Sequence, residues 1–303
     1  MTVKLETEKE RKDQSTFFKV LSQRLEYRWI GPEPGEAPTI VFLHEGLGCV
    51  GMWRDFPDLI VRESGCGALV YSRRGYGASD PVRRPRTVRF MHVEALRVLP
   101  AVIEHFDLRD FILFGHSDGA SIAIIYAGAH PRSARGLILE APHVFVEPVC
   151  IESIARIAGR PEASTQRTHA GRGSRQNYSH GNAKSLTTEQ KGYESTGLRK
   201  RLARYHGANT DSMFRTWTKV WLRPDFRQWN IEEYLTGIEA PLLVIQGEED
   251  EYGTLQQADT VVTQVRGHAE SLVLASCGHS PHRDQPKQVM SATVQFIRQI
   301  LNA

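Results

Sequence analysis

Short apolar runs alternate along this chain with longer amphipathic segments. Runs such as Thr39–Leu43 and Phe111–Phe114 are too short for helices and contain almost only apolar residues, which is typical of buried parallel strands. We expect strands at residues 25–30, 39–43, 67–71, 111–114, 136–139, 241–245 and 271–274. We expect helices at residues 53–62, 89–106, 121–127, 198–205, 212–222 and 290–301, after a charged helical leader. The alternation predicts an α/β fold in which helices flank a mostly parallel central sheet.

One region departs from this alternation. Residues 160–192 are rich in Ser, Thr, Gly, Asn and Gln and have almost no apolar side chain, so they bury too little surface to offset the entropy of becoming ordered. We therefore expect a single domain over residues 1–303. Within it, residues 147–235 are predicted to be an insertion between two strands that forms a helical lid, with a flexible polar segment at 160–192.

Composition narrows the class of protein. The 303 residues are 40% hydrophobic and 24% charged, with a net charge of +3, which indicates a globular protein and gives no sign of nucleic-acid binding. No apolar run is long enough to span a membrane, and the charged N-terminus does not resemble a signal peptide. The four cysteines are widely scattered, as free thiols of a cytoplasmic protein would be.

A glycine-flanked serine provides the first sign of chemistry. Gly115-His116-Ser117-Asp118-Gly119 follows a predicted buried strand and begins a predicted helix. In this context the G-x-S-x-G pattern is typical of a strained turn that lifts a nucleophilic serine clear of the sheet. Taken alone, the pentapeptide is also compatible with a tight turn that only packing requires.

A serine nucleophile needs a base and an acid that orients the base. Asp250 follows the strand at 241–245, and His279 follows the strand at 271–274, so both lie where open α/β sheets place their sites. His282 is an alternative base, and Glu249 and Glu251 are alternative acids. His44 and His116 are expected to hold loops by hydrogen bonds rather than to transfer protons.

From about residue 24 to its end, apart from the polar insert, the chain resembles the α/β-hydrolase superfamily. The matching motifs are HEGLG at 44–48, RGYGASD at 74–80, GHSDG at 115–119, GEED at 247–250 and GHSPHRDQP at 278–286. The resemblance implies that Ser117 is the nucleophile, Asp250 the acid and His279 the base. It also implies an oxyanion hole made by the amides of Asp118 and Gly46, with Leu47 as the alternative to Gly46.

The function implied is hydrolysis of small carboxylic esters through an acyl-enzyme, with a small-molecule substrate and without a metal or organic cofactor. A lactonase or a C–C bond hydrolase of the same fold is the first alternative, and a non-catalytic ligand-binding protein on this scaffold is the second. A third possibility is that the basic insert at 160–192 docks an acidic partner. Trp53, Trp217, Trp221 and Tyr252 either line a substrate pocket or belong to the buried side of a lid.

Overall fold

A twisted sheet forms the centre of the molecule. The computed structural model describes residues 16–159, 192–194 and 196–302, and in this part of the chain an eight-stranded sheet has the order β1-β2-β4-β3-β5-β6-β7-β8. Strands β1 and β2 run antiparallel to their neighbours, whereas β4 to β8 and β3 pair in parallel. The strands are β1 (Thr16–Val20), β2 (Gln23–Ile30), β3 (Thr39–Leu43), β4 (Gly67–Tyr71), β5 (Phe111–His116), β6 (Gly136–Glu140), β7 (Leu242–Gly247) and β8 (Ala269–Leu274).

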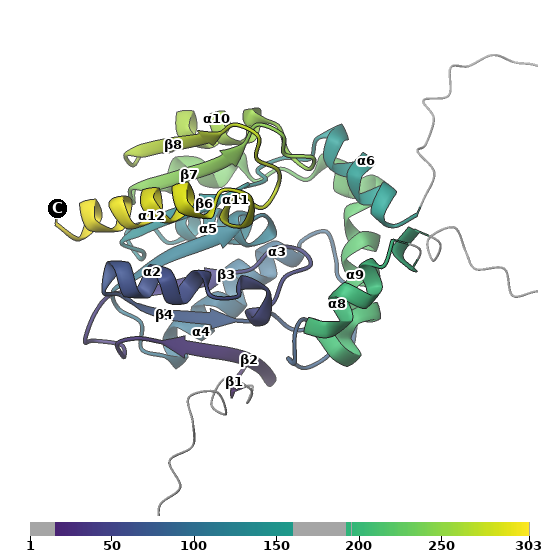
Figure 1. The fold of residues 1–303 in the computed structure, drawn as a ribbon, viewed down its shortest axis with the longest axis horizontal. Coiled ribbons are helices and arrows are strands. Elements are labelled where there is room, and N and C mark those ends of the chain that lie inside the picture. Colours follow the sequence, from purple (N-terminus) through teal and green to yellow (C-terminus); the bar gives the residue numbers. More distant parts are fainter. Residues whose placement is uncertain (1–15, 160–191, 195, 303) are drawn as a thin grey trace, which may run out of the picture.

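Helices cover both faces of the sheet (Figure 1). Helices α2 (Phe56–Ser64) and α12 (Pro286–Leu301) cover one face and contribute to one hydrophobic core. The other face is covered by α3 (Phe90–Val93), the π-helical turn η2 (Glu94–Val98), α4 (Leu99–His105), α5 (Asp118–Ala129) and α10 (Leu255–Gln264). Because both faces are covered, every residue of β3, β4, β5, β6 and β7 is buried, which explains why these strands are apolar except near their ends.

A group of helices interrupts the alternation between β6 and β7. It comprises α6 (Pro148–Ile157), α8 (Leu198–His206) and α9 (Thr210–Trp221), with the short 3-10 turns η3 (Gly207–Asn209), η4 (Pro224–Gln228) and η5 (Glu232–Gly237). Helices α6, α8 and α9 stand together at the end of the sheet where the parallel strands terminate (Figure 1). Two further short helices, η1 (Val50–Trp53) and α11 (Pro281–Asp284), follow β3 and β8 at the same end.

The mostly parallel sheet flanked by helices confirms the predicted fold class, and each predicted strand is present, some with longer ends. The edge strand β1 was missed, because a helical leader was expected before residue 25. The helix expected at 53–62 begins later, at Phe56, after the 3-10 turn that ends at Trp53. The four cysteines are free and buried. Most of the predicted flexible segment at 160–192 lies outside the described residues.

From the sequence we expected no membrane-spanning segment. In the described ranges of the chain, no helix has both the length and the apolar character needed to cross a bilayer.

Candidate active site

Ser117 occupies a sharp turn between β5 and α5. Its backbone angles, φ 53° and ψ −119°, lie in a region that residues with side chains rarely adopt. A Cβ on Gly119 would lie 1.9 Å from the Leu43 carbonyl oxygen, and one on Gly115 would lie 2.5 Å from the Gly119 carbonyl oxygen. Only glycine fits at both positions, so the two glycines permit the turn that raises the Ser117 hydroxyl above the sheet.

His279 and Asp250 meet Ser117 at this point. The loop after β8 places His279 Nε2 2.9 Å from Ser117 Oγ, and the loop after β7 places Asp250 Oδ1 2.8 Å from His279 Nδ1. Asp250 is fixed in turn, because its Oδ1 accepts the Tyr252 amide at 2.8 Å and its Oδ2 accepts from Gln246 Nε2 at 2.7 Å. The three side chains named from the sequence therefore form one continuous chain of contacts.

Electrostatics favour an ionised acid beside a basic imidazole. Burial alone would raise the pKa of Asp250, but His279 and the Tyr252 amide outweigh it and lower this pKa to about 2. Burial likewise opposes a charged His279, yet the adjacent Asp250 carboxylate outweighs burial and raises the pKa of His279 above its ordinary value. The nearby His143 and His116 differ, because burial lowers their pKa values to about 3 and about 4 and keeps both rings neutral.

The amides named for an oxyanion hole lie beside Ser117. Asp118 is the first residue of α5, so its amide has no partner within the helix. The Gly46 amide donates to no other described residue, whereas the Leu47 amide faces Glu45 Oε2 at 3.4 Å. Trp217 covers both positions: its Nε1 donates to Asp118 Oδ2 at 3.1 Å, and a Cβ on Gly46 would lie 2.2 Å from the same atom. Gly46 is required because a larger residue would collide with Trp217.

The alternative acids occupy other positions. Glu251 contacts the main chain rather than the ring of His279, since its Oε2 accepts the His279 amide at 3.3 Å. Glu249 is exposed and makes no side-chain hydrogen bond with another described residue. Neither carboxylate orients the imidazole of His279.

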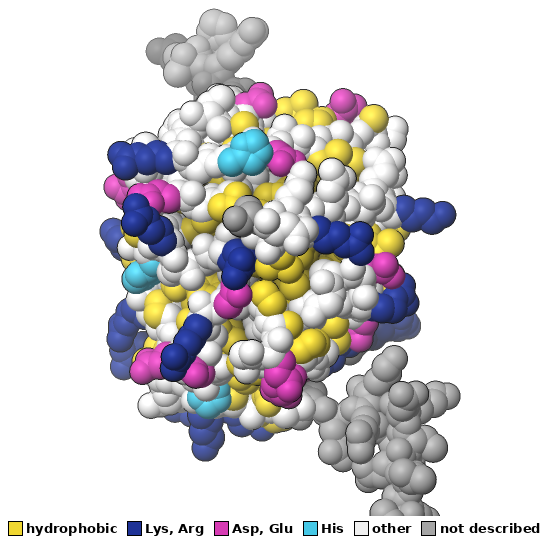
Figure 2. All heavy atoms as spheres, turned by 90° about the vertical axis from the view of Figure 1, so that its left-hand side faces the viewer, with side chains coloured by type: hydrophobic (Ala, Val, Ile, Leu, Met, Phe, Trp, Pro, Cys, Tyr) yellow, Lys and Arg dark blue, Asp and Glu magenta, His cyan; other side chains and the backbone are white. Residues whose placement is uncertain are grey.

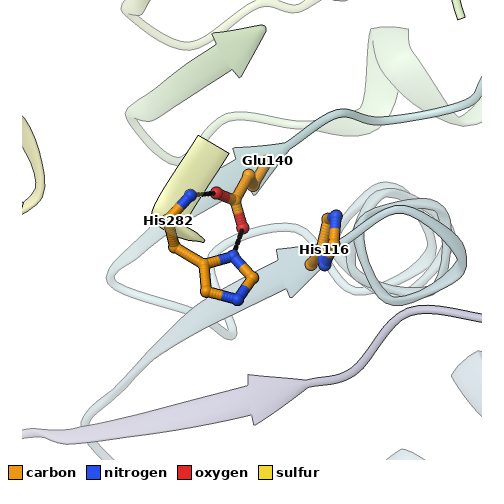
Figure 3. A group of neighbouring side chains, drawn as sticks. All are labelled: His116, Glu140 and His282. Atoms are coloured by element: carbon orange, nitrogen blue, oxygen red, sulfur yellow. Dashed lines mark hydrogen bonds and ion pairs between the residues drawn. The ribbon is translucent and has the colours of Figure 1, made fainter. Parts of the chain in front are cut away.

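The alternative base, His282, belongs to a separate buried cluster. Its Nδ1 contacts Glu140 Oε2 at 2.7 Å, its main-chain amide donates to Glu140 Oε1, and Trp53 and Phe56 cover its ring. In Figure 3 the Glu140 carboxylate points to His282, and the His116 ring lies to one side. His282 therefore has no contact with Ser117.

We tested whether this cluster fits a metal ion, because ligand atoms of His116, Glu140 and His282 lie within 4.8 Å of one another. Both Glu140 oxygens already accept hydrogen bonds from His282, and His116 Nε2 donates to the His279 carbonyl oxygen at 2.7 Å. Two imidazole nitrogens remain, fewer than the three or four protein ligands of a usual zinc site. The cluster is better described as a hydrogen-bond network that holds the main chain of His279.

His44 and His116 hold loops, as predicted. His44 Nδ1 lies 2.7 Å from the Glu45 carbonyl oxygen, and its Nε2 accepts the Arg73 amide at 3.1 Å. The buried Arg73 side chain also donates to the carbonyl oxygens of His44 and Glu45, which fixes the loop that carries Gly46.

A pocket opens above Ser117 and His279. Its volume is about 320 Å³, and its walls come from the loops after β3 and β7 and from α6, α8 and α9. Trp217, Trp221 and Tyr252 line it, so the aromatic residues from the insertion are both buried and part of a pocket wall, whereas Trp53 packs beneath the site. Sequence reasoning missed His143, Arg54 and Arg201, which no motif marks, and gave no role to Glu45 and Arg283, although both lie inside quoted motifs.

The α/β-hydrolase class is defined by this order of strands together with three features of the loops that follow them. These are a strained serine turn after β5, an acid after β7 and a histidine after β8. The chain belongs to the alpha/beta hydrolase family, whose family model matches residues 40–292. Among curated relatives, 2-succinyl-6-hydroxy-2,4-cyclohexadiene-1-carboxylate synthase of Salmonella paratyphi C (strain RKS4594) is 25% identical over 274 residues, which cover 88% of this chain and 96% of the relative.

Solved structures show the same fold. A thermophilic esterase from Thermogutta terrifontis is 17% identical with a TM-score of 0.65, over 95% of this chain and 99% of that chain. Est816, described as an N-acyl homoserine lactone degrading enzyme, is 20% identical with a TM-score of 0.63, over 93% of this chain and 100% of that chain.

Proposed function

We propose that this enzyme hydrolyses small carboxylic esters, with Ser117 as nucleophile, His279 as general base and Asp250 as the acid that orients the base. One observation carries the proposal: His279 Nε2 lies 2.9 Å from Ser117 Oγ, and its Nδ1 lies 2.8 Å from Asp250, at the floor of a pocket. A base within hydrogen-bond reach of a serine hydroxyl is the geometry that proton abstraction requires.

In the first half-reaction, Ser117 Oγ attacks the ester carbonyl carbon as His279 Nε2 takes the hydroxyl proton. The carbon–oxygen bond to the alcohol then breaks, and His279 returns the proton to the departing alcohol. In the second half-reaction, water attacks the acyl-serine and His279 accepts a proton from the water. Its return to Ser117 Oγ releases the carboxylic acid, so one ester and one water give one acid and one alcohol.

The oxyanion that forms in each step needs donors that are already in place. We assign this role to the amides of Asp118 and Gly46, since neither donates to another described residue and both flank Ser117. Residues 147–235 act as a lid in this proposal, because α6, α8 and α9 form the pocket wall opposite Ser117.

The proposal is tested by hydrolysis of 4-nitrophenyl acetate and butyrate by the wild type and by Ser117→Ala. We expect turnover by the wild type and a loss of roughly 10⁵-fold or more in the variant. Ser133→Ala is the matched control, since Ser133 does not line the pocket and its hydroxyl donates to the His130 carbonyl oxygen at 2.7 Å. Equal turnover by the wild type and Ser117→Ala would refute the proposed nucleophile.

Two relatives favour a second candidate function within the same class. The synthase is named for a carbocyclic product, a cyclohexadiene carboxylate, and Est816 is described as degrading an N-acyl homoserine lactone. Acyl-enzyme chemistry at Ser117 also suits a lactone, and a C–C bond hydrolase needs the same base. Assays on a simple lactone and on a vinylogous diketone separate these substrates from open-chain esters. A wild type that is labelled once at Ser117 by a fluorophosphonate but turns over none of them would favour the ligand-binding protein instead.

A further inference from the structure

The pocket above Ser117 carries more positive than negative charge. Its walls include Arg54, Arg201 and Arg283, against Glu45 and Glu251. By contrast, on the face of the molecule opposite the lid helices, cationic and acidic side chains are intermingled (Figure 2).

Part of this charge is already compensated. Glu45 lies 3.7 Å from the Arg283 guanidinium, and Arg283 also donates to the Met52 carbonyl oxygen at 3.1 Å. Glu251 accepts the His279 amide. No carboxylate of a described residue lies within ion-pair distance of Arg54 or Arg201, and both side chains are exposed. Two cations thus remain available to a ligand.

These two arginines come from distant segments that the fold brings together. Arg54 follows η1, and Arg201 belongs to α8. The two elements touch, since a Cβ on Gly51 would lie 3.2 Å from the Tyr205 ring. Arg54 has φ 55° and ψ −127°, a conformation that residues with a side chain rarely adopt and that is found more often at ligand sites.

Each guanidinium keeps donors for a ligand. Arg201 uses one nitrogen, which donates to the Thr196 carbonyl oxygen at 3.1 Å, and Arg54 makes no side-chain hydrogen bond with a described residue. A planar guanidinium binds a carboxylate through two parallel hydrogen bonds, which a neutral group cannot reproduce.

The rest of the pocket wall is largely apolar, and Leu47, Ile154, Leu202 and Trp217 contribute to it. We infer that the substrate is an ester that carries a carboxylate, with an apolar stretch between the carboxylate and the scissile carbonyl. Arg54 and Arg201 bind this carboxylate while the apolar wall holds the stretch over Ser117. The inference rests on the proposed ester hydrolysis and adds the class of substrate.

The test compares two matched pairs of esters. In the first, 4-nitrophenyl hydrogen adipate is compared with 4-nitrophenyl hexanoate, so that the carboxylate lies on the acyl side. In the second, 6-(butanoyloxy)hexanoate is compared with hexyl butyrate, so that it lies on the alcohol side. We expect kcat/KM to be roughly tenfold higher for the anionic member of at least one pair, mainly through KM. This preference shrinks as ionic strength increases.

Arg54→Gln and Arg201→Gln should each reduce that preference by roughly three- to tenfold and leave the neutral esters almost unchanged. Lys200→Gln is the matched control, because Lys200 is an exposed residue of the same helix that does not line this pocket. Activity that needs Ser117 but has no anionic preference in either pair, or a preference that survives both substitutions, would overturn this inference and leave the proposed function intact. Activity that does not need Ser117 would overturn the proposed function itself.

Discussion

Two histidines that lie three residues apart in this chain each contact a carboxylate, with almost the same distance. His279 Nδ1 lies 2.8 Å from Asp250, and His282 Nδ1 lies 2.7 Å from Glu140. They differ in what the opposite nitrogen reaches. His279 Nε2 lies 2.9 Å from Ser117 Oγ at a pocket, whereas His282 Nε2 is buried and has no partner among the described residues. A histidine held by a carboxylate thus becomes a candidate base only where its free nitrogen meets a nucleophile.

The largest expected difference between the pairs is in activity. His279→Gln should lower kcat/KM for 4-nitrophenyl butyrate by roughly 10⁵–10⁶-fold, because no other base in the described part of the chain contacts the Ser117 hydroxyl. His282→Gln should cost less than about tenfold, since His282 acts only through packing and hydrogen bonds. Steady-state kinetics of the two variants decide the matter, and equal losses would make the distinction between the pairs wrong.

The two carboxylates next to His279, Asp250 and Glu251, should also differ in their effect on activity. Asp250→Asn removes the charge that stabilises the imidazolium and disturbs the tautomer, so kcat should fall by roughly 10⁴-fold. Glu251→Gln retains the position of the side chain next to the His279 main chain and should have an effect below about tenfold. If Glu251→Gln were the more damaging substitution in kcat, the assignment of the acid would have to change.

The buried pair should matter more for stability. Burial alone would raise the pKa of Glu140, but His282 and His116 outweigh it and lower this pKa, so the carboxylate is ionised in the core. Glu140→Gln leaves one donor of His282 without an acceptor and should reduce the free energy of unfolding by about 1–3 kcal/mol in urea titrations. The exposed Glu249→Gln should change it by less than about 0.5 kcal/mol. Equal stability of both variants would contradict the structural role of Glu140.

The smallest effect is on the pH profile. His279 must be neutral to accept a proton, so kcat/KM should increase with pH through its raised pKa, above the ordinary value of 6.5. Asp250→Asn removes the carboxylate that raises the pKa of His279, whereas burial, which lowers this pKa, remains. The acid limb of the residual activity should therefore move to lower pH. An acid limb that stays in place would show that Asp250 does not set the pKa of the base.

The sequence predicted the central strands best. Thr39–Leu43 and Gly67–Tyr71 have the predicted bounds, because helices bury both faces and leave no polar position inside either run. Strand β1 was missed because it is a short edge strand, joined to β2 by Leu21 and Ser22 with φ 46° and 61°. Such a turn usually has Asn-Gly, and Leu-Ser gives no comparable signal.

The candidate site also has residues that the sequence predicted and residues that it did not. Ser117, Asp250 and His279 were predictable because each follows a strand in a short motif, and the fold brings the three together. The role of the pocket arginines was not predictable, since Arg54 and Arg201 lie far apart in sequence and line one pocket only because η1 and α8 meet in the fold. Specificity at this site therefore depends on tertiary contacts that no local pattern records.

The most direct test of the account is covalent labelling by a fluorophosphonate, read by mass spectrometry of the proteolysed protein. We expect one adduct per chain, located on Ser117, with slow labelling in His279→Gln and normal labelling in His282→Gln. An adduct on another residue, or labelling at the wild-type rate in His279→Gln, would contradict the proposed nucleophile and base.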